Sequence, residues 1–278
     1  MTVKEIFPNL GEFQKYSDGM VADTSIEQLM PSIRSCIRDI NEYIPKEVCA
    51  AILTGDEEEP IELLKSAIAS GASYKYQIFA SAKKNGSEAS MYKYQHEEVK
   101  AHHLESYWAS LDALLDWLDA HSESFDWSKT DTFSDREKLP VKNAHEFDKY
   151  FGIGNSSHFY FKVLYLIRQV WNGDIAPALP EEASEKILEL AKQALCYKVM
   201  ALAVIQFDIT ELPRSVRFDD SHEYSKSSQP QQRTSLYNQF ISRYTSLMQS
   251  IDRAKASAAG VTGLGTAQDE DQKYYATL

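Results

Sequence analysis

The feature that most constrains how this chain can fold is a pattern that it contains twice. The sequence N-x-x-E-F-x-K-Y occupies residues 9–16 and recurs at residues 143–150. A partial match over eight residues can arise by accident in a chain this long, so it counts only if the following segments also match in order. The aligned apolar pairs that follow are Ile33 with Val163, Cys36 with Leu166, Ile37 with Ile167, and Ile40 with Val170. This collinear order predicts an internal duplication.

Each copy continues with a segment that begins at a proline and then closes with a longer helix. The proline-started segments run from residue 60 to about residue 81 and from residue 180 to about residue 210. The sequence therefore predicts an all-α protein of two tandem helical-bundle units, residues 1–138 and 139–257, with a flexible tail at 258–278. A packing unit of this kind has no built-in active site. The matched residues of the closing helices are Tyr107, Leu111, Leu114 and Leu118, and Tyr237, Ile241, Tyr244 and Met248.

Apolar residues at intervals of three and four predict helices over residues 26–44, 88–121, 183–209 and 234–257. Ser25 with Gln28, or Thr24 with Glu27, offers a capping box for the helix over 26–44. Pro31 lies inside that pattern, so we expect the helix to be kinked or to begin later, near residue 30. The helix over 183–209 is apolar around much of its circumference and is expected to be central in its unit.

The intervening segments carry weaker signals. Residues 154–157 form a cap-rich turn that predicts the start of a helix. Residues 122–140 are polar without a strong period, and we interpret them as the connection between the units. Residues 212–220 partly alternate apolar and polar, which predicts a short extended, β-like loop. The polar stretch 225–232 around Pro230 is expected to be mobile.

Composition narrows the class of protein. The formal net charge of −12 argues against a surface that grips nucleic acid, because phosphate binding needs clustered lysine and arginine. An acidic surface still suits DNA that slides past without binding. The longest apolar runs are too short to span a bilayer, and the N-terminus lacks a signal-peptide pattern, so we expect a protein made in the cytoplasm without a membrane partner. Cys36, Cys49 and Cys196 are expected to be buried, reduced thiols.

Motifs that carry chemistry are mostly missing from the sequence. No nucleophile elbow, P-loop or strand-borne dinucleotide motif occurs. The best metal candidate is His96, Glu97 and Glu98 with His102 and His103, but its spacing fits neither H-E-x-x-H nor the E-x-x-H of di-iron bundles. A solvated helix face is the favoured interpretation. We therefore predict no catalytic residue, no metal and no cofactor.

Several short motifs in this order resemble a known group of proteins. They are residues 12–16, 114–118, 125–127 and 146–150. Together they resemble an uncharacterised family from phages and prophages of Bacteroides-like bacteria, whose unit is also duplicated. More distantly, each unit is similar to the small helical head–tail adaptor, or connector, proteins of tailed phages, which form rings under the portal.

The resemblance implies a structural virion protein of the phage neck. It would form a homo-oligomeric ring that joins the portal protein to tail or stopper proteins, while DNA passes without sequence-specific binding. The duplication departs from the single-unit adaptor and leaves the subunit count open. The alternatives are a metal-dependent helical-bundle enzyme using Glu98, His96 and His102, or a cellular helical scaffold or regulator. The residues expected to contact partners are Arg214, Arg217, Phe218, Tyr274, Tyr275 and Leu278.

Overall fold

The computed structural model describes residues 3–17, 24–84, 90–208, 211–216 and 225–258, without the side chains of 78–84, 90–97, 214, 225–229 and 258. Throughout these ranges the regular structure is helical and no β-strand occurs, which confirms the predicted all-α class. Packing divides the chain into two compact units, Met1–Tyr165 with Ile209–Arg217, and Leu166–Asp208 with Phe218–Leu278. The predicted boundary between two duplicated helical-bundle units, at residue 139, stays a prediction.

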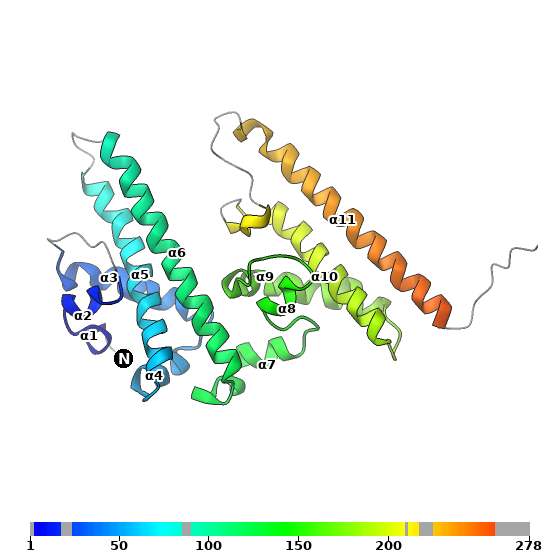
Figure 1. Cartoon of the computed structure of the whole chain (residues 1–278), viewed down its shortest axis with the longest axis horizontal. Helices are drawn as coiled ribbons and strands as arrows, with labels where there is room; N and C mark the ends of the chain where they lie inside the picture. The colour runs from blue at the N-terminus through cyan, green and yellow to red at the C-terminus, as the bar shows by residue number, and fades with distance from the viewer. Residues whose placement is uncertain (1–2, 18–23, 85–89, 209–210, 217–224, 259–278) are drawn as a thin grey trace, which may run out of the picture. The chain divides into compact units, whose positions relative to one another are not determined.

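The first unit is built on two long helices, α5 and α6, that lie side by side (Figure 1). Its elements are α1 (Val3–Ile6), α2 (Leu10–Gln14), α3 (Ile26–Ile40), α4 (Lys46–Thr54), α5 (Glu58–Lys84), α6 (Ser90–Ala120), η1 (Ser124–Lys129), α7 (Asp131–Glu137), α8 (Ala144–Asp148), η5 (Arg214–Val216) and α9 (Ser157–Val170), whose residues from Leu166 onward belong to the second unit.

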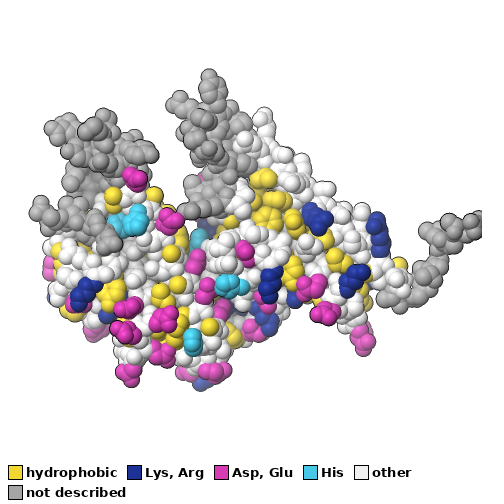
Figure 2. Space-filling view, viewed as in Figure 1, with side chains coloured by type: hydrophobic (Ala, Val, Ile, Leu, Met, Phe, Trp, Pro, Cys, Tyr) yellow, Lys and Arg dark blue, Asp and Glu magenta, His cyan; other side chains and the backbone are white. Residues whose placement is uncertain are grey.

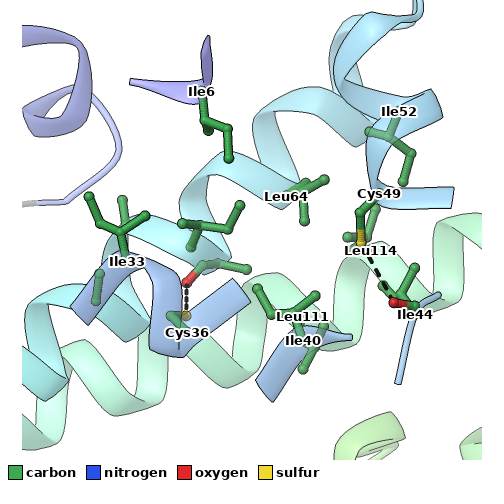
Figure 3. Close-up of a cluster of buried hydrophobic side chains, with 14 of the residues drawn as sticks. Ile6, Ile33, Cys36, Ile40, Ile44, Cys49, Ile52, Leu64, Leu111 and Leu114 are labelled. Atoms are coloured by element: carbon green, nitrogen blue, oxygen red, sulfur yellow. Dashed lines mark hydrogen bonds between the residues drawn. The ribbon is translucent and has the colours of Figure 1, made fainter. Parts of the chain in front are cut away.

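The core of the first unit lies where α3 and α6 pack on α5 (Figure 3). Buried apolar side chains of α3 point toward Leu64 of α5 and toward Leu111 and Leu114 of α6. Cys36 belongs to this core, where its thiol donates to the carbonyl of Ala67 at 3.8 Å and burial raises its pKa to about 12. All three cysteines are buried, as predicted.

A close approach of three helices explains why α5 contains a run of small residues, from Ala69 to Ser73. A Cβ atom added at Gly71 would lie 2.5 Å from Cys36 Sγ of α3 and 2.8 Å from Tyr107 Cδ2 of α6. Both distances are far below normal van der Waals contact, so only glycine fits there without movement of its neighbours. Gly71 therefore sets how closely α3 and α6 approach α5.

Helix α3 begins as one of the two predicted capping boxes requires. Ser25 Oγ accepts from the Gln28 N–H at 3.4 Å, and the Gln28 side chain accepts from the Ser25 N–H at 3.2 Å. The helix runs from Ile26 and keeps Pro31 inside it, so the expectation of a start near residue 30 is wrong. The cap satisfies N–H groups that would otherwise lack a partner, which favours the earlier start.

Both copies of N-x-x-E-F-x-K-Y form the same local structure, a five-residue helix with an asparagine cap. Asn9 (φ −151°, ψ 172°) and Asn143 (φ −150°, ψ 175°) each accept, at 2.9 Å, from the backbone N–H three residues along the chain. Phe13 and Phe147 are both fully buried. The shared residues thus form the same Asn-capped short helix in both places, while the duplication of the whole unit stays a prediction.

The polar segment 122–140, which we interpreted as the connection between the units, is itself folded. It forms η1 and α7, and it buries Trp127 completely and Arg136 almost completely. Arg136 donates to both carboxylate oxygens of Asp119, at 2.8 and 2.6 Å, and Trp127 Nε1 donates to Asp119 Oδ1 at 2.9 Å. Arg136 can be buried because Asp119 of α6 neutralises its charge. Hydrophobic periodicity in the sequence does not reveal an ion pair of this kind.

Three further expectations need correction. The described part of 212–220 contains the 3-10 turn η5 rather than an extended strand. Residues 225–232, expected to be a mobile loop, form the first turns of α11. Pro180 does not start a helix, because α10 begins at Glu185 after Ser184.

The second unit is a hairpin of two long helices, α10 (Glu185–Gln206) and α11 (Ser225–Ala258), that follow the short η2 (Trp171–Ile175) and η3 (Ala176–Ala178). Helix α10 buries residues around most of its circumference, which confirms that it is central in its unit. Cations of α11 bind main-chain carbonyls at the C-terminal end of α10 and in η3. Arg233 donates to Val204 O at 3.3 Å and to Phe207 O at 2.8 Å, while Lys255 donates to Ala178 O at 2.8 Å.

Candidate functional site

The most concentrated group of polar side chains in the first unit lies where α9 begins beside α6. We call it the α6–α9 cluster. Asp112 Oδ1 accepts from the His158 backbone N–H at 2.7 Å, and Ser157 Oγ donates to Asp116 Oδ1 at 3.1 Å. The cluster consists of Trp108, Asp112, Asp116, His145, Asn155, Ser156, Ser157 and His158.

Two histidines complete the cluster. The His158 ring stacks on Trp108, with ring centroids 3.6 Å apart and planes at 18°, and its Nδ1 lies 3.2 Å from Ser156 Oγ. His145 Nε2 lies 3.3 Å from Asp116 Oδ2, and its Nδ1 lies 3.0 Å from Asn155 Oδ1. Every one of these groups therefore has a partner that holds it in place.

Burial raises the pKa of Asp112 from 3.8 to about 6, although the hydrogen bond from the His158 N–H acts in the opposite direction. Carboxyl groups with raised pKa values are common at functional sites, but structural networks also produce them. Here Asp112 lies at the N-terminal end of α9, where a carboxylate satisfies N–H groups and interacts favourably with the helix dipole. Its position is explained by helix capping.

The cluster has the residue types of a nucleophile–base–carboxylate arrangement without its geometry. In such an arrangement the carboxylate accepts from the histidine ring and so orients it toward the nucleophile. Here Asp112 accepts from the backbone of His158, and the ring nitrogen nearest Ser156 is Nδ1. Ser156 Oγ also accepts from the Phe159 N–H at 3.3 Å, as an N-cap does. The cluster therefore joins α9 to α6 and offers no assembled nucleophile.

The sequence predicted the α9 side of this cluster but not the α6 side. The cap-rich turn at 154–157 does start a helix, as predicted. The partners on α6 were missed because Asp112 and Asp116 are more than forty residues away in the chain. One signal was available, since two carboxylates four residues apart interrupt a helix that is otherwise rich in leucine.

The predicted metal candidate does not form a cluster in the described part of the chain. Glu98 and His102 are exposed on α6, whereas His103 is buried. The side chains of His96 and Glu97 lie outside the description. No group of three or more His, Cys, Asp or Glu side chains that could hold a metal ion occurs in the part of the chain that the structure describes.

The predicted partner-contact residues lie mostly outside the described ranges. Arg214 has a described backbone, in η5, but no described side chain. Arg217, Phe218, Tyr274, Tyr275 and Leu278 are all outside. None of the helices that the structure does describe is long and apolar enough to cross a membrane.

The outer surface of α11 is the second candidate, and its chemistry is unusual. Exposed helix faces normally carry many charges. Here the exposed residues with described side chains include only three charged ones, Arg243, Asp252 and Arg253, and Figure 2 shows this edge as mostly white with some blue. We call these three residues and their uncharged neighbours the polar face of α11. The uncharged members are Pro230, Gln231, Gln232, Thr234, Ser235, Asn238, Gln239, Ser242, Thr245, Ser246, Gln249, Ala256 and Ser257.

The inner surface of α11 is apolar, but many of its apolar side chains are only partly buried. Its buried contacts to the rest of the second unit come from Phe240, Leu247 and Ile251, as far as the helix is described. Tyr237, Ile241, Tyr244 and Met248, which sequence matching paired with core residues of α6, are half-buried. The α6 counterparts are buried. The two closing helices therefore differ in burial although their apolar residues align.

Comparisons with protein-family models, with curated proteins and with solved structures each found no match.

Proposed function

We propose that this chain is a non-catalytic assembly protein, and more specifically a ring-forming head–tail adaptor in the neck of a tailed phage. The observation that carries the assembly role is the polar face of α11. This face runs along a 34-residue helix and presents mainly hydroxyl and amide groups where a solvent-exposed helix normally presents charges. Surfaces depleted of charge are typical of the buried centre of protein interfaces.

The α6–α9 cluster supports the non-catalytic part of the proposal. Its carboxylates, hydroxyls and imidazoles are occupied in capping α9 and in attaching it to α6. The phage neck, the portal protein and the tail or stopper proteins as partners follow from the sequence resemblance. The negative net charge suits a channel through which DNA passes without binding.

Mass and shape in solution test the proposal. Light scattering of the full chain is expected to give a mass that is a multiple of 31.6 kDa, and negative-stain microscopy is expected to show rings. Addition of purified portal protein should move both proteins into one sedimenting complex. A chain that stays monomeric at every concentration tested and never co-sediments with a portal ring would contradict the adaptor role.

A further inference from the structure

Charge is distributed unevenly along this chain. Residues 225–258, which form α11, contain five Lys and Arg residues and one carboxylate, Asp252, for a net charge of +4. The rest of the chain contains the other 24 basic and 40 acidic residues, for a net charge of −16. No carboxylate occurs between Glu223 and Asp252. Helix α11 therefore has the opposite sign to the protein that carries it.

The cations of α11 with described side chains divide into two groups by their contacts. Arg233 and Lys255 bind main-chain carbonyls and hold the hairpin together. Arg243 and Arg253 are exposed on the polar face, and neither forms an ion pair with a described carboxylate. Arg243 lies over the Tyr197 ring, with its guanidinium carbon 5.9 Å from the ring centroid. The two arginines are ten residues apart, about 15 Å along the axis.

A surface of opposite sign lies at the start of α5. Asp56, Glu57, Glu58, Glu59 and Glu62 are five exposed carboxylates within seven residues. Some of them face the positive end of the α5 dipole. None of them is ion-paired to a cation in the part of the chain that the structure describes. This acidic start of α5 thus complements the polar face of α11 in charge.

We infer that the polar face of α11 docks against the acidic start of α5 in a second copy of this chain. The two surfaces are different, so the contact is head-to-tail and each copy offers one of each. Contacts of this kind generate a ring when the rotation between copies closes. The inference rests on the proposed function, because it names the surfaces through which an adaptor ring would assemble.

A nucleic acid is the other polyanion that a basic helix could bind. Strong phosphate binding usually takes several Lys and Arg contacts, and the described exposed face supplies only Arg243 and Arg253. Its uncharged members are hydroxyls and amides, together with Pro230 and Ala256. The one carboxylate of the face, Asp252, is paired with Lys255 at 2.8 Å. The two arginines match a small acidic protein surface better, because a few close ion pairs can fix the register of an interface.

The test combines two charge-reversed variants of the full chain. The first carries Arg243→Glu and Arg253→Glu, and the second carries Glu59→Lys and Glu62→Lys. Sedimentation velocity should show self-association weakened at least roughly tenfold for each variant alone, because like charges then face each other. An equimolar mixture should recover the wild-type assembly, since each reversed surface meets its complement. A control with Lys46→Glu and Lys186→Glu changes the net charge as much as the first variant and should assemble normally.

Each result separates the inference from the proposed function. If the wild type assembles and the first variant assembles equally well, the docking surface is wrong while the adaptor role stands. If the mixture fails to recover assembly, the acidic start of α5 is not the counterpart. If the first variant assembles normally but no longer binds a short random DNA duplex, the partner of the polar face of α11 is a nucleic acid and not a second copy of the chain. A wild-type protein that is monomeric would contradict both the docking inference and the adaptor role. Circular dichroism of every variant excludes misfolding as the cause of lost assembly.

Discussion

Replacement of Gly71 by alanine tests whether the close approach of α3, α5 and α6 is as tight as the structure indicates. Alanine normally stabilises the interior of a helix by about 1 kcal/mol relative to glycine. At Gly71 the new methyl group would lie 2.5 Å from Cys36 Sγ and 2.8 Å from Tyr107 Cδ2. Both neighbours are buried, with exposures of 0% and 5%, so neither can move aside without disturbing the core.

The expected magnitude follows from these two opposing effects. Overpacking of a well-packed core costs about 1–3 kcal/mol, and two simultaneous clashes place Gly71→Ala near the upper end. After subtraction of the propensity gain, the free energy of unfolding should fall by about 2 kcal/mol. For a unit of this size, that corresponds to a Tm lower by about 4–8 °C.

Urea denaturation followed by circular dichroism measures the effect, and two further variants make it specific. Gly152→Ala is the matched control, because its new methyl group would have no atom within 4 Å, and it should be neutral or slightly stabilising. Cys36→Ala removes the closest atom, so Gly71→Ala should cost less in that background than in the wild type. A Gly71→Ala protein as stable as the wild type, or the same cost in both backgrounds, would refute the reasoning.

Two other predictions concern buried charges. Asp119→Ala leaves the Arg136 guanidinium buried without its acceptor and should destabilise the first unit by about 3–5 kcal/mol in urea denaturation. Lys15→Ala, which removes an exposed pair, should have a much smaller effect, and equal effects would contradict this prediction. Asp112 has a raised pKa of about 6 in the folded chain against 3.8, so its contribution to stability is complete below about pH 4 and is lost as the pH rises through 6. Asp112→Asn should therefore raise the free energy of unfolding by up to about 3 kcal/mol at pH 7.5 and leave it unchanged at pH 4, and an equal gain at both pH values in thermal denaturation would argue against it.

The sequence predicted what local chemistry determines. Helical periodicity located α10, and the capping residues located the starts of α3 and α9. The N-x-x-E-F-x-K-Y pattern forms the same capped helix in both places because an asparagine cap and one buried phenylalanine act within five residues. These features need no distant partner, which is why they were accessible from the sequence alone.

The features that the sequence did not reveal depend on partners far away in the chain. Arg136 looks like a surface residue until Asp119 and the rings of Trp127 and Phe161 surround it. The start of α11 was misread because a proline among polar residues is typical of a loop, whereas Pro230 lies inside α11, beyond its first turn. The polar face of α11 was not predicted, because binding surfaces were expected where charged residues cluster and this helix has few charged residues.

The two cations of α11 that bind main-chain carbonyls, one at the C-terminal end of α10 and one in η3, also determine how α11 is aligned in the second unit. Arg233 and Lys255 are 22 residues apart, about 33 Å in a helix, so the two contacts hold α11 at points far apart along its length. A slip of one helical turn would move α11 by about 5.4 Å along the hairpin. Such a slip would separate both cations from their carbonyls at once. The two contacts therefore select one register of α11 in the hairpin. Any surface that α11 presents is held at a fixed position along the hairpin axis.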